Sequence, residues 1–189
     1  KLNGYFFPPV INEAEKNAKV KIATYVTNSI MYKVKKTPCQ SIDKRLFSSC
    51  IELSFMDKKL NIVNCYYPDG VSYGQADWLF DLDSNANWMI IGDFNSHHTL
   101  WSEKRQHNNL INNNNYLANT ITNANLTVLN DGSITRISDR SDQKSSSIDL
   151  SLVSPDINPL CSWQVHQVPL GSDHLPIEIQ IATSPEILH

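Results

Sequence analysis

The segment Trp88-Met89-Ile90-Ile91-Gly92-Asp93-Phe94-Asn95-Ser96-His97-His98 carries more information on fold and chemistry than any other part of the chain. Its apolar first half is typical of a buried strand, and an acid and an amide follow two residues apart at the polar end. Side chains two apart on a strand point the same way, so we expect Asp93 and Asn95 to face one site together. Gly92 lets backbone or a ligand approach closely just before the acid.

Two further segments bring acids to strand-like runs. Ser147-Ile148-Asp149-Leu150 holds one acid within such a run, and Gly171-Ser172-Asp173-His174 precedes another alternating run. Strand ends with Asp and Asn, with Asp, and with Asp and His suit the hydrolysis of a phosphate ester. Carboxylates can hold a hard cation such as Mg²⁺, which neutralises the charge that gathers on the phosphate oxygens. A His–Asp pair supplies an oriented acid–base group near neutral pH.

Length and composition favour a single globular domain. The chain has 189 residues, of which 41% are apolar, and a net charge of -3, so it has no strong general field for nucleic acid, although a local basic face can sit on an acidic body. No apolar run approaches the roughly 20 residues that span a bilayer, and we expect neither a secretory signal nor membrane contact. The four cysteines lack metal-type spacing and are interpreted as reduced thiols of an intracellular protein: Cys39, Cys50, Cys65 and Cys161.

The hydrophobic pattern predicts many strands and few helices. Strands are expected over 19–26, 30–35, 47–55, 60–67, 88–92, 126–129, 148–153, 161–168 and 176–181, and helices over 75–82 and 109–123. The polar segment 131–146 is expected to be a loop. This mixture is typical of a layered α/β sandwich in one domain.

Together these motifs resemble the endonuclease/exonuclease/phosphatase superfamily. The resemblance lies in Gly92-Asp93-Phe94-Asn95, Ser147-Ile148-Asp149-Leu150 and Ser172-Asp173-His174. Within that superfamily, His97-His98 followed by Leu100-Trp101, and the pair Leu129-Asn130, resemble the apurinic-type endonuclease domain of non-LTR retrotransposons. The resemblance extends over roughly residues 4–182. It implies a DNase I-like, four-layered α/β sandwich in which two packed mixed sheets are flanked by helices.

The resemblance also implies roles for individual residues. Asp93 matches the acid that handles the proton of the attacking water or the leaving group, and Asn95 matches the amide that orients it and touches the scissile phosphate. Tyr66 matches a tyrosine that bonds the phosphate. Amide and phenol donors of this kind stabilise a developing oxyanion.

The remaining implied roles concern proton transfer and metal binding. His174 matches the catalytic histidine, Asp149 the acid that fixes its imidazole, and Asp173 an acid near the metal. The implied cofactor is Mg²⁺, with Mn²⁺ as a substitute. The family also carries an asparagine and a metal-binding glutamate on two earlier strands, for which we find no equivalent upstream of Lys19. We therefore expect residues 1–189 to form one domain that lacks its first strands, with 183–189 as a tail.

DNA contacts are expected from two regions. The polar loop before Asp149 contributes Arg136, Arg140 and Lys144, because guanidinium and ammonium groups bind phosphates and this loop in the family helps to choose the target. Trp101 and His98 are the other candidates. Simpler interpretations are a solvated loop for the three cations, and packing of one histidine near Trp101 with the other in solvent.

Three functions remain open from the sequence. The leading hypothesis is a Mg²⁺-dependent DNA endonuclease domain that nicks one target strand to prime reverse transcription, in the nucleus and linked to the rest of a reverse-transcriptase polyprotein. A second is a catalytically inactive relic that binds DNA or a partner. A third is a phosphomonoesterase of the same superfamily.

Overall fold

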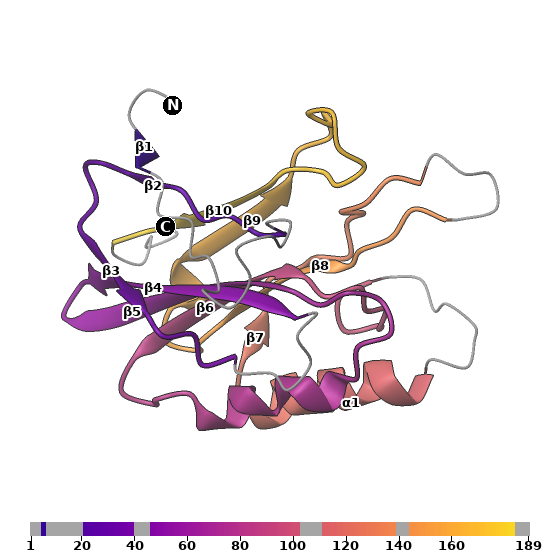
Figure 1. The fold of residues 1–189 in the computed structure, drawn as a ribbon, viewed down its shortest axis with the longest axis horizontal. Coiled ribbons are helices and arrows are strands. Elements are labelled where there is room, and N and C mark those ends of the chain that lie inside the picture. Colours follow the sequence, from indigo (N-terminus) through magenta and orange to yellow (C-terminus); the bar gives the residue numbers. More distant parts are fainter. Residues whose placement is uncertain (1–4, 7–20, 40–45, 103–110, 139–143, 184–189) are drawn as a thin grey trace, which may run out of the picture.

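The computed structural model describes residues 5–6, 21–39, 46–102, 111–138 and 144–183 (Figure 1). Its centre is a mixed sheet of six strands in the order β3-β4-β5-β6-β8-β7. The strands are β3 (Tyr32–Lys35), β4 (Phe47–Phe55), β5 (Lys58–Tyr66), β6 (Asn87–Asp93), β7 (Thr127–Val128) and β8 (Asp149–Val153). β5 and β6 pair in parallel and the other neighbours are antiparallel. The predicted hairpin of 47–55 and 60–67 is confirmed as β4 and β5.

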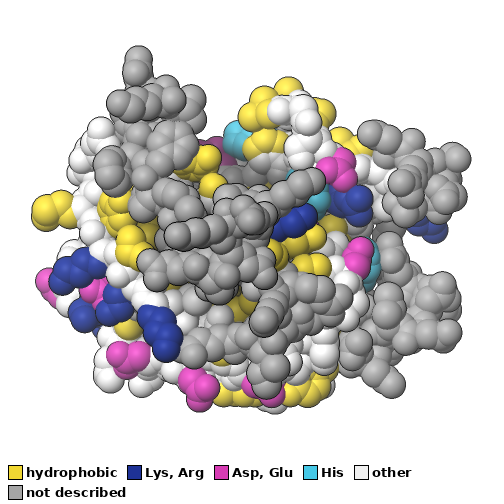
Figure 2. Space-filling model, in the orientation of Figure 1, with side chains coloured by type: hydrophobic (Ala, Val, Ile, Leu, Met, Phe, Trp, Pro, Cys, Tyr) yellow, Lys and Arg dark blue, Asp and Glu magenta, His cyan; other side chains and the backbone are white. Residues whose placement is uncertain are grey.

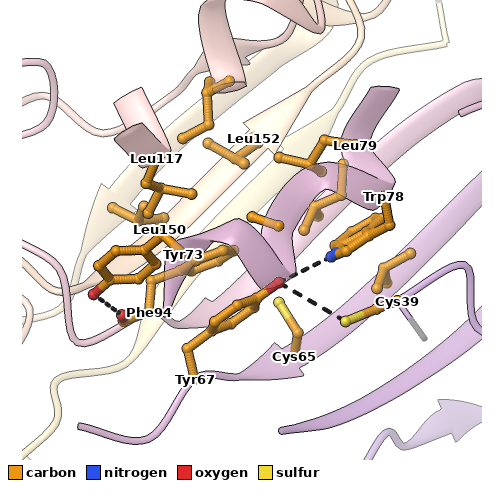
Figure 3. Packing of buried hydrophobic residues seen from close by; sticks show 14 of the residues in the cluster. Cys39, Cys65, Tyr67, Tyr73, Trp78, Leu79, Phe94, Leu117, Leu150 and Leu152 are labelled. Carbon is orange, nitrogen blue, oxygen red and sulfur yellow. Dashed lines mark hydrogen bonds between the residues drawn. The ribbon is translucent and has the colours of Figure 1, made fainter. Parts of the chain in front are cut away.

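Helices cover one face of this sheet. The helix α1 (Ile111–Asn123) and the 3₁₀ helix η1 (Tyr73–Asp81) lie side by side below it in Figure 1. Strand alternation turns Val63, Ile90 and Leu152 toward these helices, where they are completely buried. The main apolar core of the described residues therefore lies between the sheet and the helices (Figure 3).

A second, two-stranded sheet packs on the opposite face. It consists of β9 (Cys161–Val165) and β10 (Ile177–Ile181), which follow the short 3₁₀ helix η2 (Asn158–Leu160) and pair antiparallel. Met89 and Val153 of the large sheet meet Ile179 of this sheet in a smaller apolar cluster. The strands β1 (Tyr5–Phe6) and β2 (Val26–Thr27) form another small antiparallel pair.

The α/β sandwich is confirmed. Within the described ranges there are three layers, namely helices, the mixed sheet and the second sheet, and the outer helical layer expected over the second sheet is not among them. The described strands of the second sheet, β9 and β10, pair antiparallel. No helix in the described part of the chain is both long and apolar enough to cross a membrane.

Two predicted elements differ from the structure. The strand expected over 19–26 is wrong for 21–25, which has no regular structure and reaches the sheet by side-chain contacts: Thr24 Oγ1 lies 2.9 Å from Ser49 Oγ, and Asn64 Nδ2 donates to the Ala23 carbonyl at 3.2 Å. The helix expected over 75–82 begins at Tyr73 and is 3₁₀, with the Ser72 hydroxyl accepting from the Gly74 N–H at its start. The helix expected over 109–123 is confirmed as α1.

Candidate active site

Strand register brings three predicted residues to one end of the sheet. Asp93 ends β6, and its partners are Tyr66 at the end of β5 and Asp149 at the start of β8. Alternation along β6 places Asp93 on the same face as Met89 and opposite to the helix-facing core. The site therefore lies on the second-sheet side, at the end of the sheet.

His174 comes to these acids from the loop between β9 and β10. Its Nδ1 lies 2.9 Å from Asp149 Oδ1 and 3.0 Å from Oδ2, while its Nε2 lies 4.0 Å from Asp93 Oδ2. The hydrogen bond to Asp149 raises the pKa of His174. In the neutral ring Nδ1–H donates to Asp149, so that Nε2 is the nitrogen left to exchange a proton with a substrate.

Asp93 is the most strongly perturbed acid of the site. Burial, reinforced by the charge of Asp149, raises its pKa to about 6, although the Asn95 N–H that it accepts acts in the opposite direction. Ligand atoms of Asp93, Asp149 and His174 all lie within 4.8 Å of one another, which makes this the one group in the described residues able to hold a metal ion. Raised carboxyl pKa values in a cleft are typical of functional sites.

Asn95 joins Asp93 through a turn rather than through the strand expected from the sequence. β6 ends at Asp93, and Asn95 has a φ of 46°. Its N–H donates to Asp93 Oδ1 at 2.9 Å, and its Nδ2 donates to the Tyr67 carbonyl at 2.9 Å and to Asp93 Oδ2 at 3.3 Å. The acid and the amide are thus locked together, and Asn is one of the few residues that tolerate this backbone conformation.

Gly92 has the close-approach role expected of it. A Cβ built on Gly92 would lie 1.8 Å from the main-chain oxygen of Cys65 on the neighbouring strand. Only glycine therefore fits at the position that precedes the site acid. Tyr66 is half-buried at the same end of the sheet, with its ring centroid 6.4 Å from that of Phe47.

Asp173, the expected metal ligand, lies outside the cluster of Asp93, Asp149 and His174. Its Oδ2 accepts from Arg136 Nε at 2.8 Å, and this guanidinium lowers the pKa of Asp173. The backbone of Arg136 also forms bridges to Ser146 and to His174. Arg136 therefore links the polar loop to the segment that carries the histidine.

The other predicted DNA contacts have different outcomes. Trp101 is wrong as a DNA contact, because it is 1% exposed and its indole N–H donates to the Ser96 carbonyl inside the core. His98 is half-buried against Trp101 with ring centroids 5.2 Å apart, and its Nδ1 accepts from the Leu100 N–H. Lys144 is exposed, and Arg140 lies outside the described residues.

The charged surface agrees with the weak net charge. Among the described residues that are visible in Figure 2, basic side chains lie in separate places, with acidic side chains close to them. Lys35 and Lys59 both pair with Glu52, and Lys58 pairs with Asp156. These lysines are partly neutralised and lie away from the site.

The hydroxyl of Thr135, which is completely buried, holds the backbone at Asp149 in place. The sequence did not single out this residue. Thr135 Oγ1 accepts from the N–H groups of Ile148 and Asp149, each at 3.1 Å. Asn130 donates to the Asp149 carbonyl at 2.8 Å and accepts from the Ser151 N–H at 2.9 Å. A polar residue in a loop-like segment gives no signal of such a role without the fold.

A cavity of about 210 Å³ extends from the two acids between the sheets. Its apolar wall comes from both sheets and the segment before β10: Ile91, Leu150, Leu175, Ile177 and Ile179. Asn64, Asp93, Asp149 and Ser151 supply its polar groups. The carboxylates thus stand between solvent and an apolar cleft, which accounts for the raised pKa of Asp93.

Comparisons with known proteins agree with this geometry. The family described as endonuclease-reverse transcriptase matches residues 60–178, which is more than half of the chain. No curated protein matches significantly. The chain therefore belongs to the endonuclease-reverse transcriptase family, and it is an enzyme of the class that hydrolyses phosphodiester bonds.

Solved structures share the fold at low sequence identity. The endonuclease domain of TRAS1, a telomere-specific non-LTR retrotransposon, has a TM-score of 0.59 at 17% identity, over 79% of this chain and 80% of that one. The AP endonuclease LMAP from Leishmania major has a TM-score of 0.63 at 13% identity, over 83% and 64%. A Leptotrichia buccalis protein of the endonuclease/exonuclease/phosphatase family has a TM-score of 0.50 at 15% identity, over 71% and 53%.

Proposed function

We propose that this chain is a DNA endonuclease domain that uses a divalent cation to nick one strand of a target duplex. The nick would leave a 3′-hydroxyl that primes reverse transcription by the remainder of a polyprotein, inside the nucleus. The observation that carries the proposal is the row Asp93–His174–Asp149. His174 Nδ1 lies 2.9 Å from Asp149 Oδ1, and His174 Nε2 lies 4.0 Å from Asp93 Oδ2.

The residues divide the work of hydrolysis between them. Water adds to phosphorus and the bond between phosphorus and O3′ breaks, so that the oxygen of the water stays on the 5′-phosphate. The water gives up one proton, and the departing O3′ takes up one and becomes the 3′-hydroxyl. We assign the transfer of these protons to His174 Nε2 and Asp93, and the stabilisation of the imidazolium to Asp149. Tyr66 is a candidate donor to the phosphate oxygens, and Asn95 joins it when its Nδ2 gives up the longer of its two hydrogen bonds, the one of 3.3 Å to Asp93 Oδ2.

The donor set fits a hard divalent cation. Asp93 and Asp149 bring two carboxylates to one point, and burial of Asp93 beside that second charge raises its pKa to about 6. A cation there would offset the repulsion, and both Mg²⁺ and Mn²⁺ accept carboxylate oxygens. When bound, it would neutralise charge that develops on the phosphate.

Arg136 and Lys144 are the described cations that we propose to contact DNA. Arg136 is tied to Asp173 beside the site, and Lys144 is exposed in the same loop. Contacts to phosphates would fix the register of the duplex rather than read its sequence.

Nicking of a supercoiled plasmid tests the proposal. The purified chain should nick it with Mg²⁺ and not with EDTA, and His174→Ala should lose about 10²- to 10⁴-fold in rate. A soluble phosphate monoester serves as the competing substrate. Turnover of the ester without nicking would replace the endonuclease by a phosphomonoesterase. A folded chain that binds DNA without cleaving either substrate would instead be a relic, consistent with a cluster that includes no glutamate in the described residues.

A further inference from the structure

A buried tyrosine outside the proposed catalytic group holds the turn that carries Asn95. Tyr73 begins η1 and is 7% exposed. Its hydroxyl lies 2.8 Å from the main-chain carbonyl of Phe94 and 2.9 Å from that of Asn95. Figure 3 shows the contact with Phe94, across the interface between the helical layer and the strand end.

The backbone of this turn explains why one hydroxyl reaches both carbonyls. Asn95 has a φ of 46°, which reverses the chain directly after β6. Phe94 is completely buried, so its carbonyl has little access to water, and a buried carbonyl that loses its donor is costly. The Tyr73 hydroxyl thus opposes relaxation of a conformation that non-glycine residues seldom adopt.

The same turn fixes the relation between the site acid and the amide. The Asn95 N–H donates to Asp93 Oδ1 at 2.9 Å, and Asn95 Nδ2 lies 3.3 Å from Asp93 Oδ2. If the carbonyls rotate away from Tyr73, the intervening peptide planes rotate with them, and the bond from Asn95 to Asp93 is lost.

We propose that Tyr73 is a positioning residue, whose hydroxyl sets the geometry of Asp93 and Asn95 from behind the site without touching substrate. The consequence for catalysis rests on the function proposed above. The geometric part stands separately, because it concerns a hydrogen bond that exists in the free protein.

Trp78 provides a matched control on the same helix. It is 6% exposed, and its indole N–H donates to the Tyr67 hydroxyl at 2.9 Å, on the side of the core away from the turn (Figure 3). Trp78→Phe removes a buried hydrogen bond and some core volume, so it destabilises the fold at least as much as Tyr73→Phe. It alters no direct contact of Asp93 or Asn95, because it removes a bond to the Tyr67 hydroxyl, whereas Asn95 Nδ2 donates to the main-chain carbonyl of Tyr67.

The experiment compares these two variants in the full chain, at a temperature well below the unfolding of both. Plasmid nicking is measured over a range of DNA concentrations. Tyr73→Phe should lower kcat by about tenfold or more, because small displacements of catalytic groups are costly. KM should stay within about twofold for both variants, and kcat should do so for Trp78→Phe, whose lost hydrogen bond is to the hydroxyl end of Tyr67 and involves neither Asp93 nor Asn95.

Amide hydrogen exchange at Asn95, followed by NMR, provides a readout that needs no activity. Exchange should become about tenfold faster or more in Tyr73→Phe, as expected for local opening, and stay unchanged in Trp78→Phe. Equal exchange at Asn95 in the wild type and Tyr73→Phe would overturn the proposal, as would equal kcat losses in the two variants. A wild type that fails to nick, together with faster exchange in Tyr73→Phe alone, would refute the endonuclease and support the positioning role.

Discussion

The two faces of the six-stranded sheet use the same strands for different purposes. On the helix side, Ile90 and Leu152 are neighbours in register and are completely buried in the main core. On the other side, the ends of the same strands present Asp93 and Asp149, partly exposed, beside an open cavity. Neighbouring positions on one strand can therefore serve different purposes, one the stability of the core and the next the chemistry of the site, because strand side chains alternate between faces.

A substitution on the helix-facing side alone tests most strongly whether stability and activity are separate. Leu152→Ala should lower the free energy of unfolding by about 2–5 kcal/mol, the range for a large side chain removed from a packed core. Nicking per folded molecule should stay close to that of the wild type at low temperature, since Leu152 faces the helices whereas Asp93 and Asp149 face the second sheet. Denaturant unfolding and a nicking assay on the same preparation check both halves. Loss of activity in a fully folded sample would mean that the two faces are coupled.

Protons should compete with the divalent cation for Asp93 and His174, on the face of the sheet that carries the site. Burial raises the pKa of Asp93 to about 6, so this carboxyl is mostly protonated at pH 5 and ionised at pH 8. Protonation of His174, whose pKa Asp149 raises, acts in the same direction by adding positive charge. Affinity for Mg²⁺ should therefore be about tenfold weaker at pH 5 than at pH 8. Calorimetric titration that gives equal affinities would remove Asp93 from the set of ligands.

The smallest effect is expected at the rim of the site. Arg136→Ala removes an exposed ion pair with Asp173, so stability should change by less than about 1 kcal/mol. Nicking should weaken. The slope of the logarithm of DNA affinity against the logarithm of salt concentration should decrease in magnitude by about 1, as expected for the loss of one phosphate contact. Lys58→Ala, which breaks the exposed pair with Asp156 away from the site, is the control and should change neither quantity. An identical salt slope in Arg136→Ala would end the DNA-contact role.

Prediction from sequence succeeded where periodicity and residue type suffice. β4, β5 and β6 follow from alternating or continuous apolar runs, and the structure brings together Asp93 and Asp149, two of the acids expected at strand ends. His174 lies only 2.9 Å from Asp149, which the family resemblance led us to expect. These features depend on local pattern or on pairs of residues that belong to known motifs.

The remaining features depend on contacts distant in sequence. Thr135 bonds the N–H groups of Ile148 and Asp149, and Tyr73 bonds carbonyls more than twenty residues away. Trp101 resembles a surface residue beside polar neighbours, yet it fills the core. The segment 21–25 alternates like a strand, but side-chain bonds to β4 and β5 hold it without a ladder. Periodicity cannot reveal which partner such groups find.

The second-sheet face of the protein gives up stability to keep a charged acid in a buried place. Asp93 is 19% exposed, and its raised pKa means that the folded state binds the proton more tightly than the unfolded chain. Ionisation therefore costs stability as the pH rises from the ordinary value of 3.8, and the cost is complete above about pH 6.

Asp93→Asn, compared with the wild type by plasmid nicking in Mg²⁺ and by denaturant unfolding at pH 4 and pH 8, tests that claim most directly. We predict loss of nicking by about 10³-fold or more. In the same variant the free energy of unfolding should rise by about 1–2 kcal/mol at pH 8 and not at pH 4. Wild-type nicking, or a variant that is less stable at pH 8, would contradict the account.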